Sequence, residues 1–218
     1  MGLLYRIGTN AASSFDKRFN TKLKERGGRL YRYCLMILSP VRRILDPIFI
    51  KFFWRSWLYH HEDIKLHLGC GWKYFKGFIN VDLKITDATN IICDISKLPW
   101  PDSSVSIIES YHVIEHISHR KIEDTLKEWH RVLKKRGQLV IECPNFDNAV
   151  KDYLCGNENR LLNIFGRQRT PGDAHLYGYN FERLFCLLKK IGFIDITEKR
   201  PQSSQTLDEP CMRVVCRK

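Results

Sequence analysis

The 218-residue sequence lacks the cysteine pattern of a disulfide framework or of a zinc site. Its eight cysteines include no Cys-x-x-Cys pair, the spacing that zinc sites normally show. Disulfide-dense chains are usually short secreted domains, and this chain is long enough for a substantial core. We therefore expect buried free thiols in a reducing compartment.

Long apolar runs are absent as well. No run reaches the roughly 18 residues that a membrane-spanning helix needs. A signal peptide also fits poorly, because the polar segment 10–20 follows the first charged residues, where an apolar stretch and a cleavage site would be expected. The sequence predicts a cytoplasmic protein.

The positive charge is concentrated at the start of the chain. Residues 1–60 hold twelve Lys and Arg against Asp16, Glu25 and Asp46, which leaves about +3 of the formal +12 to the rest. An extended basic face on a folded domain is the usual footprint of nucleic-acid binding. The distribution instead favours an acidic surface met by one basic arm.

This basic arm, residues 1–60, has the pattern of an amphipathic helix broken at Gly27-Gly28, Pro40 and Pro47. Its run 52–59 mixes bulky aromatics with basic residues, a composition that suits the interface of an anionic membrane. Alternatively these rings pack on the following domain as a cap, since aromatic stripes at helical spacing are more often core. Both interpretations stay open.

From residue 64 onward short apolar strands alternate with helices, which predicts one α/β domain with a mostly parallel sheet over 61–218. One helix follows Ser118 and stops at Gly137, and another runs from the N-cap Asn180 to Gly192. The stretch 145–180 between them is irregular and reads as a lid or binding surface. Strands are expected at 65–69, 79–82, 91–94, 105–110, 138–143, 193–198 and 211–216.

The turn Gly69-Cys70-Gly71 follows the first strand and suits a ligand that approaches the backbone there. A dinucleotide fingerprint would need a third glycine where Tyr74 stands, and a P-loop would need a Gly-Lys-Ser/Thr sequence that is missing. What remains is a site for an adenosyl group without a phosphate chain.

Five motifs in order resemble those of class I S-adenosylmethionine-dependent methyltransferases, most nearly the type-11-like group of small bacterial enzymes. The resemblance covers about residues 64–218 and implies a Rossmann-like sheet of seven strands, mostly parallel with an antiparallel last strand. The group is often associated with cell-surface glycan synthesis. The motifs are Leu66-His67-Leu68-Gly69-Cys70-Gly71, Asn80-Val81-Asp82, Cys93-Asp94-Ile95 with Leu98-Pro99-Trp100-Pro101-Asp102, Tyr111-His112-Val113-Ile114-Glu115-His116, and Leu133-Lys134-Lys135-Arg136-Gly137-Gln138-Leu139.

The resemblance implies S-adenosylmethionine as cofactor and a role for each position. Asp82 would accept hydrogen bonds from both ribose hydroxyls. Asp94 would accept from the adenine amino group, with Ile95 beside the ring. Turn capping is the alternative for both aspartates. The whole expected cofactor set is Leu68, Gly69, Cys70, Gly71, Asp82, Leu83, Asp94, Ile95 and Tyr111.

Two departures from the family pattern stand out. His67 replaces the acidic residue of the first strand, and only residues 72–78 separate the first two strands, fewer than a helical crossover normally uses. The first helix must be vestigial or borrowed, and the N-terminal segment is expected to cover that face.

Methyl transfer needs alignment of an in-line attack and a place for the acceptor's proton. His112, His116 and His175 are the candidate bases, while Glu115 orients a neighbour or caps a helix. No metal dependence is expected. The predicted activity is O-methylation of a glycan or a membrane-linked precursor, near the inner face of the membrane; the alternatives are an RNA methyltransferase and an inactive binding module.

Overall fold

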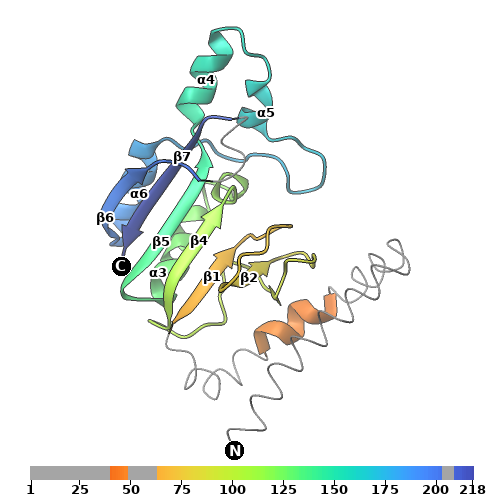
Figure 1. Cartoon of the computed structure of the whole chain (residues 1–218), viewed down its shortest axis with the longest axis vertical. Helices are drawn as coiled ribbons and strands as arrows, with labels where there is room; N and C mark the ends of the chain where they lie inside the picture. The colour runs from red at the N-terminus through yellow and green to blue at the C-terminus, as the bar shows by residue number, and fades with distance from the viewer. Residues whose placement is uncertain (1–39, 49–62, 203–208) are drawn as a thin grey trace, which may run out of the picture.

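The computed structural model describes residues 40–48, 63–202 and 209–218, which include a single seven-stranded sheet of order β3-β2-β1-β4-β5-β7-β6 (Figure 1). The first five strands run parallel, and β7 pairs antiparallel with both β5 and β6. The predicted fold class is therefore confirmed. The strands are β1 Ile64–Leu68, β2 Ile79–Asp82, β3 Ile91–Ile92, β4 Val105–Tyr111, β5 Leu133–Pro144, β6 Ile194–Lys199 and β7 Cys211–Arg217.

The two faces of the sheet differ in chemistry. Helices α3 (Ile122–Val132) and α6 (Phe181–Ile191) contact each other on one side, behind the sheet in Figure 1. Their apolar side chains form a continuous core with alternate residues of the central strands, such as Leu66 and Ile108. The residues in between point to the opposite face and include His67, Glu109, Tyr111, Glu142 and Arg213.

Helix α6 has the predicted ends. The Asn180 side chain accepts a hydrogen bond from the amide of Arg183 at 2.8 Å. At the other end Gly192 adopts a left-handed conformation with φ 111°, which closes the helix. Both signals are local, so they could be read correctly from the sequence.

The predicted end of α3 at Gly137 is wrong. The helix ends at Val132, and residues 133–137 already belong to β5. The amide of Arg136 donates to the Lys218 carbonyl at 2.9 Å, and the amide of Lys218 donates to the Gly137 carbonyl at 3.0 Å. Pairing with the end of the chain thus draws this segment into extended structure despite its helical pattern.

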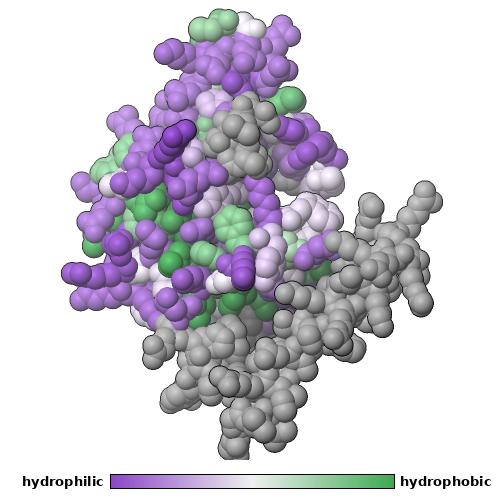
Figure 2. Space-filling view, viewed as in Figure 1, coloured by the Kyte–Doolittle hydropathy of each residue, from purple (hydrophilic) through white to green (hydrophobic). Residues whose placement is uncertain are grey.

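The stretch 145–180, expected to be irregular, contains α4 (Phe146–Leu154) and α5 (Arg160–Phe165). Asn145 starts α4 by accepting a hydrogen bond from the Asn148 amide at 3.1 Å. Figure 1 shows this pair projecting beyond the carboxyl ends of β4 and β5. Most of its visible surface is hydrophilic in Figure 2, with an apolar spot at its tip.

No helix connects β1 to β2 among the described residues; residues 69–78 form turns instead. Asn80 holds them in place. Its Oδ1 atom accepts from the Phe75 amide and from His67 Nδ1, each at 2.9 Å, and its Nδ2 atom donates to the Phe75 carbonyl at 3.1 Å. The Phe75 ring stacks on the His67 ring with centroids 4.0 Å apart. The first crossover helix is therefore vestigial, and a buried amide network takes its place.

Residues 40–48 form a helix at the edge of the sheet beside β3 (Figure 1). The Asp46 carboxylate accepts from the Ile92 amide at 2.9 Å, Arg42 donates to the Asn90 carbonyl at 2.8 Å, and Arg43 donates to the Leu83 carbonyl at 3.0 Å. The bond to Ile92 satisfies an amide of the edge strand β3, and the other two bonds hold the helix to the turns beside it.

Pro47 lies within the helix and does not interrupt it before residue 48. The aromatic run 52–59 and Gly27-Gly28 lie outside the described residues. Of the helices that the structure describes, none is long and apolar enough to cross a membrane.

Candidate active site

The turn after β1 contains two left-handed glycines with different surroundings. Gly69 has φ 70° and Gly71 has φ 52°. A Cβ atom added at Gly69 would collide with the Val113 side chain, whereas one added at Gly71 would meet nothing within 4 Å. Gly69 therefore makes room for the chain that follows β4. Gly71 leaves open space beside the turn, where a ligand can approach the backbone.

Asp82 ends β2 directly opposite this turn. Its Oδ2 atom accepts from the Gly71 amide at 2.8 Å, and its Oδ1 atom accepts from the Lys84 amide at 2.9 Å. A carboxylate oxygen can accept more than one hydrogen bond, so both oxygens keep acceptor capacity for two further donors. The side chain is thus held in a fixed orientation at the carboxyl edge of the sheet.

Asp94 is exposed and caps a turn. Its Oδ1 atom accepts from the amide of Ser96 at 2.9 Å and from the Ser96 hydroxyl at 2.8 Å. The half-buried Ile95 beside it accepts through its carbonyl from Trp129 Nε1 at 2.9 Å. The turn-capping interpretation is therefore realised for Asp94 through its Oδ1 atom.

The remaining expected cofactor residues fall into two groups. Leu68 and Cys70 are buried, so only their backbone can face a ligand; burial also raises the pKa of the Cys70 thiol to about 12. Leu83 is 47% exposed and can lie against one. Tyr111 closes β4 on the polar face.

Tyr111 is the centre of a polar network. Its hydroxyl donates to Glu109 Oε2 at 2.7 Å and accepts from Arg213 Nη1 at 3.0 Å. Arg213 also donates to Glu142 Oε2 at 3.3 Å. Burial, together with the hydrogen bond to Glu109, raises the pKa of Tyr111 to about 12. Glu109, Glu142 and Arg213 were not predicted, although polar residues alternating with apolar ones in these strands were a usable signal.

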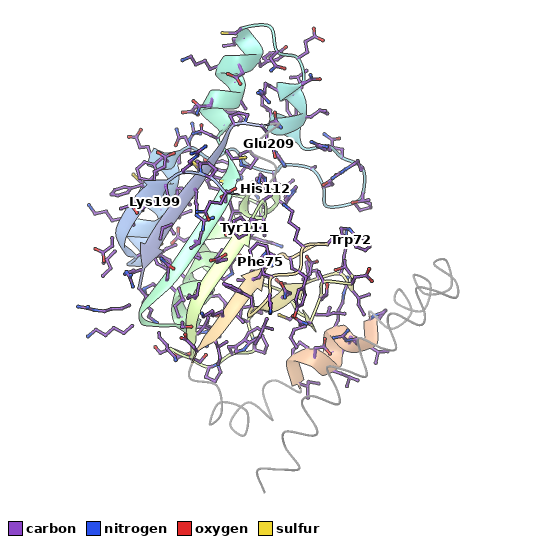
Figure 3. The ribbon with its side chains drawn as sticks, in the orientation of Figure 1. Trp72, Phe75, Tyr111, His112, Lys199 and Glu209 are labelled. Atoms are coloured by element: carbon purple, nitrogen blue, oxygen red, sulfur yellow. The ribbon has the colours of Figure 1, made fainter. Side chains whose placement is uncertain are left out.

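The structure brings the three candidate histidines together. His112 follows β4 in a left-handed conformation with φ 55°, and its amide donates to the Glu142 carbonyl at 2.7 Å. Its Nδ1 atom lies 3.5 Å from Glu115 Oε1 and 3.6 Å from Glu209 Oε1. Figure 3 shows Phe75, Tyr111, His112 and Glu209 following one another up the polar face of the sheet.

His116 and His175 form the other half of this group, with ring centroids 4.9 Å apart. The Nδ1 atom of His116 donates to the Ala174 carbonyl at 3.0 Å, and that of His175 donates to the Asn163 carbonyl at 2.8 Å. Burial lowers the pKa of His175 despite the opposing charge of Glu115. The His175 ring therefore favours the neutral state.

Glu115 lies between these rings in the short helix η1 (Ile114–His116) and is 2% exposed. Its backbone carbonyl accepts from the amides of Leu176 and Tyr177 at 2.7 and 3.3 Å, which fixes the loop carrying His175. Burial alone would raise the pKa of its carboxyl group, but the hydrogen-bonding and charge interactions with His112, reinforced by the charges of His116 and His175, lower it. The expectation of an orienting residue fits this geometry better than that of a simple cap.

Two further residues of this region, Glu209 and Cys211, were missed. The Cys211 sulfur lies 3.8 Å from His112 Nε2, on the side of the ring opposite Glu209. Asn163 of α5 donates through Nδ2 to Glu209 Oε2. Cys211 lies 99 positions from His112 in the sequence, and Glu209 lies 46 positions from Asn163, so no local pattern pointed to either residue.

Comparison with known proteins agrees with this geometry. Residues 66–141 match the family model described as a methyltransferase domain. A putative methyltransferase of Encephalitozoon cuniculi is 26% identical over 201 residues, covering 83% of this chain and 90% of that protein. A probable S-adenosylmethionine-dependent methyltransferase of Mycobacterium tuberculosis is 28% identical over 103 residues, covering 47% of this chain and 32% of that protein.

An uncharacterised protein of Methanocaldococcus jannaschii is 24% identical over 131 residues, covering 54% of this chain and 55% of that protein. The chain thus spans about half or less of the length of two of these relatives. A solved S-adenosylmethionine-dependent methyltransferase of Methanosarcina mazei shares the fold with a TM-score of 0.51 at 18% identity, over 75% of this chain and 96% of that one.

The matched domain coincides with the first five strands and with the turn that faces Asp82. Residues 66–141 thus match a methyltransferase domain, and the chain shares the fold of a solved S-adenosylmethionine-dependent methyltransferase.

Proposed function

We propose that this protein transfers the methyl group of S-adenosylmethionine to a hydroxyl oxygen of a glycan or of a related membrane-linked precursor. The observation that carries the proposal is the position of His112, one residue before the Val113 side chain that packs on Gly69. The chain at His112 therefore lies beside the cofactor turn, and its imidazole has two carboxylates on its Nδ1 side.

In this proposal the turn and the strand ends hold the cofactor. The open side of Gly71 admits the methionine part, Asp82 accepts from the ribose hydroxyls, and Asp94 accepts from the adenine amino group. Leu83 and Ile95 lie against the adenosyl group. Leu68, Gly69, Cys70 and Tyr111 shape the backbone of the same edge.

The chemical step needs one proton acceptor. The bond from the sulfonium to the methyl carbon breaks as the bond from the acceptor oxygen to that carbon forms, and the hydroxyl proton passes to a base. We take His112 as the base among the three histidines, because the next residue, Val113, lies against Gly69 in the cofactor turn. Glu115 and Glu209 orient its ring and stabilise the imidazolium.

The acceptor surface combines aromatic rings with polar groups. Trp72 is 72% exposed directly after the cofactor turn, and Phe75 packs 5.3 Å from the Tyr111 ring (Figure 3). The Tyr111 network supplies a guanidinium and two carboxylates close by. Rings bordered by hydrogen-bonding groups suit a polyhydroxylated acceptor, which has both apolar and polar faces.

The helix 40–48 supports a membrane-linked substrate. Its charged residues contact the sheet edge, whereas Val41, Ile44, Leu45 and Ile48 are 46–65% exposed. Their spacing i, i+3, i+4, i+7 makes one apolar stripe directed away from the domain. With the basic arm, this stripe suits peripheral binding to an anionic cytoplasmic membrane surface. One helix can thus both cap the sheet edge and present a membrane contact.

Calorimetry with S-adenosylmethionine and S-adenosylhomocysteine tests the donor site, and transfer of labelled methyl to a glycolipid extract tests the acceptor class. Both ligands should bind, and label should enter a lipid-linked fraction. No binding of either cofactor form would favour the inactive module. Labelling of RNA, with steeply salt-dependent RNA binding and none to anionic vesicles, would overturn the acceptor class.

A further inference from the structure

Three possible metal-ligand atoms converge at the end of η1. A carboxylate oxygen of Glu115 and one ring nitrogen each from His116 and His175 all lie within 4.8 Å of one another. They come from two segments of chain 60 residues apart, η1 and the loop after α5, so the fold rather than local sequence creates the group.

The Glu115 carboxylate is a buried anion. It is 2% exposed, and neither of its oxygens makes a hydrogen bond to any residue that the structure describes. His112 Nδ1 lies 3.5 Å from its Oε1 atom, and a nitrogen of each of the other two rings lies within 4.8 Å of the carboxylate. Burying a carboxylate in this way is costly unless a cation or several donors compensate it.

The histidines do not supply those donors in their neutral form. Each gives its Nδ1 proton to a backbone carbonyl, at 3.0 Å for His116 and at 2.8 Å for His175, so the lone pair of each neutral ring is on Nε2. In that form the cluster offers lone pairs on Glu115 and on both rings, and a cation bound between them would compensate the buried carboxylate.

We propose that Glu115, His116 and His175 bind a divalent transition-metal ion, with Zn²⁺ as the favoured metal. Two imidazoles and one carboxylate are the ligand set of many catalytic zinc sites, which keep a further position open. Metal-bound histidines almost always donate their other N–H to a carbonyl or carboxylate, and both rings here do so. This inference contradicts the expectation, drawn from ligand spacing in the sequence, that the chain has no metal.

The surrounding chain is arranged to hold these ligands. The Leu176 and Tyr177 amides bind the Glu115 carbonyl, and the His175 amide donates to the Phe165 carbonyl at 3.0 Å. Helix α5 thereby fixes His175 against η1. His175 also lines a surface pocket of about 490 Å³ with Phe146, Phe165 and Arg183, so one of the three ligands borders open space.

A second group, His112 with Glu209 and Cys211, is a weaker candidate. Glu209 lies 3.6 Å from Nδ1 of the imidazole, whereas the Cys211 sulfur lies 3.8 Å from Nε2. The two neighbours thus contact opposite ring nitrogens and do not converge on a single lone pair. His112 is better described as a ring held between them.

The test uses the untagged full chain, treated with a chelator and dialysed. Calorimetric titration should give ~1 equivalent of bound Zn²⁺, and Co²⁺ should produce a visible absorption spectrum that Zn²⁺ abolishes. Glu115→Gln, His116→Ala and His175→Ala should each weaken Zn²⁺ binding by more than about 100-fold, since even loss of an outer-shell partner costs roughly 10–100-fold. His119→Ala, a neighbouring histidine outside the cluster, and Cys211→Ala should keep wild-type affinity.

Glu115→Gln separates metal binding from a purely structural role. The amide keeps the shape of the side chain and adds two N–H donors for the histidine lone pairs, so the metal-free variant should have a Tm at or above that of the metal-free wild type. Zn²⁺ should raise the Tm of the wild type only. The proposal is overturned if the wild type binds no Zn²⁺, if Cys211→Ala abolishes binding, or if the three ligand variants retain it. No acceptor is used, so failure of methyl transfer leaves this test unaffected.

Discussion

The Gly71 amide donates to Asp82 Oδ2 over 2.8 Å, which joins the glycine turn after β1 to the end of β2. In this chain no crossover helix stands between the two strands among the described residues, so this bond and the Asn80 network set the spacing of the cofactor edge. The orientation of the Asp82 carboxylate and the shape of the turn therefore depend on each other.

Replacing Asp82 should weaken cofactor binding while the protein stays folded. Asp82→Ala removes charge-assisted hydrogen bonds to the ribose, for which we expect a loss of about 1.5–3 kcal/mol in binding free energy. Calorimetry with S-adenosylhomocysteine measures it. The matched control is Glu198→Ala, an exposed acidic residue of β6. Unchanged affinity in folded Asp82→Ala would remove this carboxylate from the site.

The two glycines of the turn should respond differently to alanine. Gly69→Ala combines left-handed strain of about 1–2 kcal/mol with a collision against Val113, so its main effect is on the free energy of unfolding. Gly71→Ala carries the strain alone, because its Cβ would enter open space, and its main effect should be on cofactor affinity. Urea unfolding and calorimetry on both variants distinguish the two. If Gly71→Ala lost as much stability as Gly69→Ala, the conclusion that only Gly69 is packed against a neighbouring side chain would be contradicted.

The features that the sequence predicted are those with local causes. The strand that enters the Gly69 turn, the Asp82 strand end and the α6 caps at Asn180 and Gly192 are all set within a few residues. The family motifs added the order of the strands. The end of α3 was misplaced because Gly137 is a strong local stop signal, while the bonds to Lys218 that decide the matter lie 81 residues away.

The candidate site was only half predictable for the same reason. The three histidines could be named as polar residues near strand ends and in a long connection. Their convergence on Glu115 depends on α5 and the loop that returns to η1, and the stretch 145–180 carried no pattern that placed it there. A buried carboxylate surrounded by imidazoles is a product of tertiary structure.

Asn80 should be among the most sensitive positions for stability. Asn80→Ala leaves the Phe75 amide and the His67 Nδ1 proton without their shared acceptor in a buried setting, and unsatisfied buried groups cost roughly 1–3 kcal/mol each. We expect a loss of about 2–4 kcal/mol in the free energy of unfolding, measured by urea. Asn159→Ala, whose side chain makes no capping bond in α5, is the control. Equal stability of the two variants would mean that another contact holds residues 69–78.

The helix 40–48 allows its two proposed roles to be separated. Ile44→Asp with Leu45→Asp interrupts the exposed stripe and should abolish sedimentation with anionic vesicles while cofactor affinity stays constant. Asp46→Ala removes the acceptor of the Ile92 amide and should lower stability by about 1–3 kcal/mol with vesicle binding retained. Vesicle binding that survives the double Asp variant would place the membrane contact outside this stripe.

The base is tested at His112, and the substitution has to respect its backbone. With φ at 55°, alanine would add strain, whereas asparagine tolerates this conformation better than most residues. His112→Asn should therefore lower the methyl-transfer rate by roughly 10²–10⁴ with cofactor affinity nearly constant. The reason is that the hydroxyl group to be methylated no longer has a base to take its proton. His119→Asn controls for a histidine change outside the cluster, and both rates are measured with the same identified acceptor. If His112→Asn retains near-normal turnover, proton removal by His112 is wrong, and an acceptor that is already nucleophilic, such as an amine or a carboxylate, becomes the better assignment.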